Sequence, residues 1–295
     1  MNTQYVNNVP RITGLLILEV RKSNPNGDPE RESSPRQRPD GNGEISPVSV
    51  KRKLRDLVLE KDGLVWTETK RSLNLTDENY QILESRGRNR DEIQKKLASK
   101  GCQEFIDAYW DGRLFGNTFL EEGGSNTIRS GVAHFGVGIS MAPIDIELST
   151  WTNKSGVEAG KDRGMAPMAF RVVKHGLYAV PFFVNPNQAH KTGCTKQDVD
   201  LMLHLLKHTY TSTRSVVRSM VEVLHAHTFT HKSRIGSVSD FAVLDALTPK
   251  KLATPSNTLS DYGLIPTWDM IKDQSIRNNS QMTFAQCGEY TDYAL

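Results

Sequence analysis

The sequence predicts an α+β fold in which one antiparallel sheet has two helices on one face. Three observations support this prediction. Strand-like runs and helix-like stretches alternate in the order β, α, β, β, α, β. The helix-like stretches carry apolar residues three and four positions apart, which gives each of them one buried stripe. The strand-like runs are rich in β-branched and aromatic residues and are bounded by turn residues.

The first strand and the first helix are separated by a long turn-rich segment. Residues 11–20, RITGLLILEV, form a nearly continuous apolar run, which is typical of a strand buried on both faces. The next segment, SNPNGDPERESSPRQRPDGNGE, is dense in turn residues and predicts a loop. Ser46 then fits the N-cap of a helix, and Pro47 fits its first position. The apolar stripe of this helix is Val50, Leu54, Leu57 and Val58.

Two strand regions, a second helix and a closing strand follow. Residues 128–139, IRSGVAHFGVGI, alternate in polarity and are rich in glycine, and residues 171–184 form another strand region. The stretch TGCTKQDVDLMLHLLKHTY (192–210) predicts a helix, with Thr195 and Asp198 at its start. Its apolar stripe is Val199, Met202, Leu203, Leu206 and Tyr210. With a last strand at 220–231, the order is that of a ferredoxin-like (RRM-like) βαββαβ palm.

Three long segments are additions to this small core. Residues 61–127 predict an inserted helical lobe, with one helix over 75–85 and a second that begins near residue 90 and ends near Asp111-Gly112. Residues 141–170 are irregular and basic, and they predict a protruding hairpin. We expect residues 1–250 to form the palm with these insertions, and residues 251–295 to be an extension that packs on the palm or on a neighbouring copy.

Composition excludes several classes of protein. The net charge is only +3, so any surface that binds anions must be local. The three cysteines are far apart and odd in number, which argues against a disulfide framework and a thiolate zinc site and favours the reducing cytoplasm. We expect no signal peptide and no membrane partner, because the apolar runs near the N-terminus are too short.

The clearest candidate site is the basic start of the first helix. Four of the five residues Lys51 to Arg55 are cationic, although cations are disfavoured at the positive end of a helix dipole unless an anion is present. Ser46, Ser49 and the free backbone N–H groups can also donate to phosphates. The helices cover one sheet face, so we expect the other face to be open to nucleic acid. A solvated helix face without a ligand is the alternative.

At this point the sequence resembles the Cas seven family, the backbone subunits of type I CRISPR Cascade complexes in the RAMP superfamily, and mainly its I-B and I-C branches. The ordered motifs that carry the resemblance are NPNGDP, PVSVKRKLRD, GRLFGN, IRSGVAHFGVGIS, KHGLYAVPFFVN, TGCTKQDVDLML and RSVVRSM. They span roughly residues 10 to 245. The chain departs from the family at 130–132, which read Ser-Gly-Val in place of Gly-Pro-Val, and its tail after about 250 matches nothing in the family.

The resemblance implies a non-catalytic protein without cofactor or metal that stacks along a CRISPR RNA and orders it for pairing with target DNA. It implies a palm, a helical lobe and a thumb that reaches toward the next copy and displaces a base. Implied partners are the CRISPR RNA, target DNA, further copies, and Cas five and Cas eight type subunits, with a small subunit as an option. The expected RNA-binding residues are Arg21, Asn24, Asn26, Ser49, Lys51, Arg52, Lys53, Arg55, Arg129, Lys154, Lys161, Arg163, Met165, Met168 and His227.

Several alternatives stay open at this stage. The segment 141–170 could be a disordered surface loop, and its methionines could fill the core. His225, His227 and His231 share a strand face and could bind a metal, but no nearby carboxylate or cysteine completes a site, so a face lining the guide groove is favoured. Asp28 is a turn residue, or the carboxylate of a type III-like metal-dependent RNase. An RNA-binding module that does not oligomerise is a further alternative.

Overall fold

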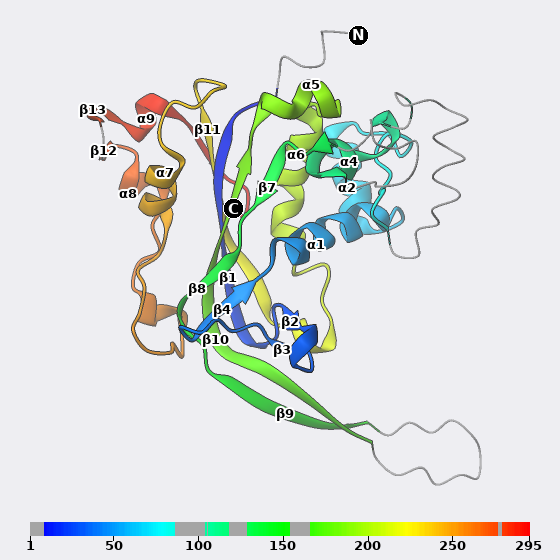
Figure 1. The fold of residues 1–295 in the computed structure, drawn as a ribbon, viewed down its shortest axis with the longest axis vertical. Coiled ribbons are helices and arrows are strands. Elements are labelled where there is room, and N and C mark those ends of the chain that lie inside the picture. Colours follow the sequence, from blue (N-terminus) through cyan, green and yellow to red (C-terminus); the bar gives the residue numbers. More distant parts are fainter. Residues whose placement is uncertain (1–8, 86–103, 105, 118–128, 154–165, 277–278) are drawn as a thin grey trace.

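The computed structural model describes residues 9–85, 104, 106–117, 129–153, 166–276 and 279–295 (Figure 1). The strands are β1 (Ile12–Ser23), β2 (Gly27–Asp28), β3 (Ser34–Pro35), β4 (Asn42–Ile45), β5 (Gly116–Asn117), β6 (Arg129–Ser130), β7 (Ala133–Phe135), β8 (Gly138–Pro143), β9 (Ile146–Asn153), β10 (Ala166–Val184), β11 (Val221–His231), β12 (Ser275–Ile276), β13 (Asn279–Thr283) and β14 (Gly288–Asp292). The α-helices are α1 (Pro47–Leu59), α2 (Leu64–Leu73), α4 (Trp110–Phe115), α5 (Ala189–Thr192), α6 (Lys196–Leu205), α7 (Asp240–Leu247), α8 (Trp268–Ile271) and α9 (Phe284–Cys287).

A large antiparallel sheet forms the centre of the fold, so the predicted mixed α/β fold with an antiparallel sheet is confirmed. Its strand order is β14-β11-β1-β10-β8-β4, and β7 and β9 also pair with β10. The central strand β1 pairs with β10 from Ile12↔Val184 to Ser23↔Val173. It pairs on its other side with β11, through a bulge between Ile17 and Leu18.

One face of this sheet is covered by α1, α2, α4, α5 and α6 (Figure 1). The helix starts agree with the sequence. Ser46 caps α1 by accepting a hydrogen bond from the Ser49 N–H, and Thr195 and Asp198 form a capping box on α6. All residues of the two predicted apolar stripes are buried in the core on this face, where they pack against Leu16, Leu18 and Val20 of β1.

The other face of the sheet is also covered, so the expectation of an open sheet face is wrong. In the tail that follows β11, helices α7, α8 and α9 and the small β12–β13 sheet lie over this face, whereas β14 extends the large sheet beside β11 (Figure 1). A second core joins Leu15 and Ile17 of β1 to side chains of the tail such as Leu247 and Phe284. The physical reason is the composition of β1, which is apolar at both odd and even positions and must be shielded from water on both faces.

The segment 141–170 is more regular than its sequence predicts. Strand β9 pairs with the first half of β10 in a continuous register from Ile146↔Val173 to Asn153↔Ala166. The hairpin extends away from the centre of the sheet (Figure 1). Its tip, residues 154–165, lies outside the described residues, and so do Lys154, Lys161, Arg163 and Met165.

The helical predictions for the inserted segment were partly wrong. Residues 75–85 form turns instead of a helix, because their polar groups are held from outside: the Asp77 carboxylate accepts from the Trp66 indole, and the Leu83 N–H donates to Asp111. The predicted second helix is interrupted at Tyr109, which is extended and pairs with Gln81. A separate helix, α4, begins at Trp110 and ends at Phe115, and Gly116 follows it with a positive φ of 78°. Residues 86–103 lie outside the described residues. No helix in the described part of the chain has the length and hydrophobicity needed to cross a membrane.

Candidate nucleic-acid interface

The start of α1 is fastened to the turn-rich loop that precedes it. The Asn26 side-chain oxygen accepts from the Ser46 N–H at 2.7 Å, and the Asn24 amide donates to the Ser33 carbonyl at 2.7 Å. Asn24 is buried, whereas Asn26 and Ser49 are half-buried. These predicted site residues therefore act first on the chain itself, because they set the position of the helix start.

The four cations of α1 fall into two classes. Arg52 and Arg55 each have an acidic partner: the Arg52 guanidinium donates to Asp56, with Nε at 2.8 Å, and Arg55 Nε donates to the Asp111 carboxylate at 2.8 Å. Arg52 also donates to the Glu84 carbonyl at 3.0 Å. The charges of both arginines are compensated within the protein, so they contribute less to anion binding than their number in the sequence indicates.

Lys51 and Lys53 have no carboxylate in salt-bridge contact among the described residues. The Lys51 ammonium lies 5.2 Å from the centroid of the Phe115 ring, and burial, followed by repulsion from Arg55, lowers the Lys51 pKa. The Lys53 ammonium lies 4.6 Å from the Tyr210 ring centroid. The aromatic faces stabilise the two cations without neutralising their charge.

Lys53 is the more strongly perturbed of these two lysines. Its ammonium donates to the Thr213 hydroxyl at 2.9 Å, and the side chain is only 5% exposed. Burial, with repulsion from Arg218 as the next cause, lowers its pKa to about 8, and the attraction of Asp56 opposes this change only weakly. A protonated Lys53 is therefore a poorly solvated cation that a nearby anion would stabilise.

Two residues that the sequence analysis did not select belong to this region. Arg218 ends the short 3₁₀ turn Val216–Arg218, and its Nε is buried without a hydrogen-bond partner among the described residues. The turn is joined to the end of β1 by a 2.7 Å hydrogen bond from the Asn24 N–H to the Val217 carbonyl. His134 has a lowered pKa because of burial and then because of Lys51. Both residues lie in motifs that carry the family resemblance, Arg218 in RSVVRSM and His134 in IRSGVAHFGVGIS, and these motifs were the available signal.

We call Lys51, Lys53 and Arg218 the cation cluster. In the described residues, none of the three forms a salt bridge with an acidic side chain. The set has two parts, because Lys53 and Arg218 repel each other, whereas Lys51 lies beside Phe115 and is repelled by Arg55. Like charges in a partly buried setting, such as Lys53 with Arg218 and Lys51 with Arg55, create a positive potential along α1. The arrangement suits a ligand with more than one negative charge, such as a nucleic-acid backbone.

The predicted cations outside α1 are placed less favourably. Arg21 is exposed, but its guanidinium is bound by the Glu19 carboxylate through hydrogen bonds of 2.7 and 2.8 Å. The backbone of Arg129 in β6 pairs with Asn117 in β5, and the side chain of Arg129 is outside the described part of the structure. Met168, the predicted apolar contact to a base, is 38% exposed on β10, so its side chain is accessible to a ligand.

The family of the chain follows from a comparison over most of its length. The family profile described as CRISPR-associated protein Cas7 matches residues 10–266. The chain belongs to the Cas7 family. The match includes α1, the cation cluster and most of the sheet of this Cas7 chain. No curated protein sequence gave a significant match.

Solved structures resemble the Cas7 chain only distantly. A chain of a "CRISPR RNA-guided surveillance complex, pre-nicking" is 15% identical, with a TM-score of 0.45, and the alignment covers 75% of this chain and 78% of the other. A chain of a second "CRISPR RNA-guided surveillance complex" is 16% identical, with a TM-score of 0.44 and coverage of 75% and 69%. A chain of a "Type III-B Cmr-beta bound to cognate target RNA" is 13% identical, with a TM-score of 0.39 and coverage of 75% and 61%.

Asp28 of the Cas7 chain has a turn-forming role. Its carboxylate accepts from the Glu30 N–H at 3.2 Å and caps the 3₁₀ turn Pro29–Arg31, and Arg36 lies 3.8 Å away. These contacts are those of an Asx-type cap. In the described part of the chain, the metal-compatible group of three side chains consists of His225, His227 and Asp292, and it does not include Asp28.

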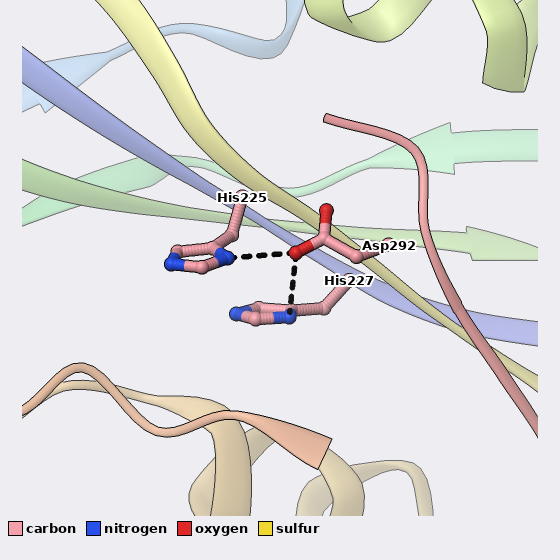
Figure 2. A group of neighbouring side chains, drawn as sticks. All are labelled: His225, His227 and Asp292. Carbon is pink, nitrogen blue, oxygen red and sulfur yellow. Dashed lines mark hydrogen bonds and ion pairs between the residues drawn. The ribbon is translucent and has the colours of Figure 1, made fainter. Parts of the chain in front are cut away.

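His227 does not line a groove, so this prediction was wrong. Its side chain is fully buried, because the C-terminal strand β14 pairs with β11 and places Asp292 opposite His227. The His227 ring stacks on His225 at 4.7 Å, and its Nδ1 lies 2.7 Å from the Tyr290 hydroxyl (Figure 2). Burial lowers the His227 pKa to about 4, despite the opposing charge of Asp292. A neutral buried ring cannot bind phosphate.

Proposed function

We propose that this Cas7 chain is a non-catalytic backbone subunit of a type I CRISPR surveillance complex, which binds the guide RNA and orders it for pairing with target DNA. The family match supports the class of protein. The cation cluster carries the RNA-binding part of the proposal, because none of its three cations forms a salt bridge in the described residues and the attraction of Asp56 on Lys53 is weaker than the effects of burial and of Arg218. A phosphate placed there would offset the repulsion within the cluster and the cost of burying Lys53.

We propose that the RNA follows the helix side and not the sheet face. The tail covers the second face of the sheet, so the path must pass α1 and the turn at Val216–Arg218. In this arrangement the strands β11, β1, β10 and β8 with α1 and α6 act as a ferredoxin-like palm. The β9–β10 hairpin acts as the thumb, reaching toward the next copy and displacing a base from the guide.

The absence of catalysis is also part of the proposal. Type III-like RNA cleavage would require a carboxylate free to bind a metal, whereas Asp28 is used as a cap. We further propose that the protein works in the cytoplasm with other Cascade subunits of the Cas five and Cas eight type. Incubation of the protein with guide RNA, Mg²⁺ and complementary RNA tests the proposed absence of catalysis. Cleavage of the complementary RNA that disappears in Asp28→Ala would overturn this part of the proposal.

Binding of a labelled guide RNA at several salt concentrations tests the cation cluster. The variant Lys51→Gln/Lys53→Met/Arg218→Gln removes three charges while keeping side-chain volume. Each lost phosphate contact should reduce the slope of log affinity against log salt by about 0.7. Lys250→Gln/Lys251→Gln, two exposed tail lysines, is the matched control and should bind like the unchanged protein. Equal affinities of the triple variant and the control at every salt concentration would reject the assignment.

A further inference from the structure

We propose that His225 and His227 bind one divalent transition-metal ion through their Nε2 atoms, and that Asp292 positions His225 for this role. The site lies on the tail-covered side of β11, apart from the cation cluster, and the proposal does not depend on the function proposed above. Histidine nitrogens are common ligands of zinc, copper, nickel and iron, so the ligand class is a borderline metal and not magnesium or calcium.

The two rings are held parallel by the strand that carries them. Residues two positions apart on a strand point to the same face, and the His225 and His227 ring centroids are 4.7 Å apart with an angle of 9° between the planes. Figure 2 shows that in both rings Nδ1 lies on the side of Asp292 and Nε2 on the opposite side. The two Nε2 atoms therefore lie on the same side of the pair. To bind one ion at the usual distance of about 2.0–2.1 Å, the stacked rings have to turn toward each other, so that both lone pairs converge on the ion.

The Nδ1 atoms already have the partners that metal-binding histidines need. His225 Nδ1 lies 2.7 Å from Asp292 Oδ2, and His227 Nδ1 lies 2.7 Å from the Tyr290 hydroxyl and 3.9 Å from the same carboxylate oxygen. The other oxygen of Asp292 accepts from the backbone N–H groups of Ala226 and Ala294 at 2.8 and 3.0 Å, which fixes the carboxylate. A carboxylate that holds the Nδ1 proton of a ligating histidine is the usual support of such a site.

The Nε2 atom of His227 supplies an independent indication of a ligand. It is buried and has no hydrogen-bond partner among the residues that the structure describes. A proton on this atom would be a buried donor without an acceptor, whereas a proton on Nδ1 can be donated to the Tyr290 oxygen. The favoured tautomer thus leaves the Nε2 lone pair free. His225 is 17% exposed, which gives an ion access from solvent.

The ion would stabilise the end of the chain. Both proposed ligands lie on β11, while Asp292 and Tyr290, which orient them, lie on β14. Because the two rings are oriented only when β14 is paired with β11, ion binding favours this paired state. We expect added Zn²⁺ to raise the unfolding temperature of the full chain and to slow hydrogen exchange in β14.

Titration of the metal-free full chain with Zn²⁺, followed by calorimetry, tests the proposal. We expect one ion per chain, a loss of affinity of at least about tenfold in His225→Ala, and a loss of about 10- to 100-fold in Asp292→Asn. His190→Ala, which removes an exposed histidine on α5, is the matched control and should bind normally. Unchanged binding in His225→Ala, or complete loss in Asp292→Asn with retention in His225→Ala, would overturn the proposal.

A measurement on the unchanged protein covers the case in which a variant fails to fold. Histidine ¹⁵N NMR distinguishes Nε2 from Nδ1, and Zn²⁺ should shift the Nε2 signals of two rings while their Nδ1 atoms stay protonated. Shifts of the Nδ1 signals, or an absence of shifts at saturating Zn²⁺, would reject the assignment.

Discussion

Lys53→Met is expected to make the free protein more stable and its binding to RNA weaker. Lys53 is 5% exposed, and burial lowers its pKa from 10.5 to about 8. At about 1.4 kcal/mol per pKa unit, the protonated side chain destabilises the fold by about 3 kcal/mol. Methionine fills a similar volume but loses the hydrogen bond to Thr213 and the contact with the Tyr210 ring, which together contribute about 1–2 kcal/mol. The net expectation is a gain of about 1–2 kcal/mol at pH 7.

The sign of the pH dependence follows from the lowered pKa. Below about pH 8 Lys53 is protonated in both states, and the full cost of burying its charge is present. Between about pH 8 and pH 10.5, Lys53 loses its proton in the folded protein but keeps it in the unfolded chain. The free-energy cost of burying the charge therefore decreases over this range and vanishes near pH 10.5. The advantage of Lys53→Met over the unchanged protein is therefore largest at pH 7 and is lost by about pH 10.5.

Urea unfolding at pH 7, 8.5 and 10, monitored by tryptophan fluorescence, measures this difference. Lys251→Met, at an exposed position in the tail, is the control and should change stability little at any pH. A variant that is less stable than the unchanged protein at pH 7, or a stability difference that does not vary with pH, would refute the reasoning. Lys53 would then be a packing residue rather than a cation held at a cost for an anionic ligand.

Two further predictions concern the tail and the carboxylates of Glu19 and Asp240. Phe284→Ala removes a buried ring that packs edge-on against Phe229 at 6.4 Å, and should destabilise the protein by about 3–5 kcal/mol in urea unfolding; a loss below 1 kcal/mol would mean that the tail is not part of the core. Burial acts to raise the pKa values of Glu19 and Asp240, but hydrogen bonds and nearby cations lower both below their usual values. The two ionised carboxylates therefore stabilise the folded protein at pH values above their unfolded-state pKa of about 4, and this stabilisation is lost as the pH falls through their folded-state pKa values. The unfolding temperature should decrease between about pH 5 and 3. A constant unfolding temperature over this range would contradict that assignment.

The cation cluster depends on contacts between distant parts of the chain. Arg52 and Arg55 are compensated by acids, so the positive potential at α1 comes from fewer residues than the sequence suggests. Arg218 comes from a segment more than 150 residues later in the chain, and it joins the site because its turn is hydrogen-bonded to the end of β1. The interface is therefore a product of sheet pairing as much as of the basic helix.

Local signals in the sequence determined the elements of the core. Ser46 with Pro47 marked the start of α1, Thr195 with Asp198 marked the start of α6, and the apolar spacing identified the buried side of each helix. These features depend on contacts between residues a few positions apart, which a sequence displays directly. The ordered motifs likewise pointed to the Cas7 family.

Only the tertiary structure decided which charges are free, which sheet face is covered and what His227 contacts. Asp111 neutralises Arg55 from 56 positions away, and Asp292 reaches His225 from 67 positions away. Pairing of this kind depends on strand order and on the path of the tail, which no local pattern encodes. The apolar residues on both faces of β1 require two covering layers. Only the folded structure shows that helices α7, α8 and α9 of the tail supply the second layer.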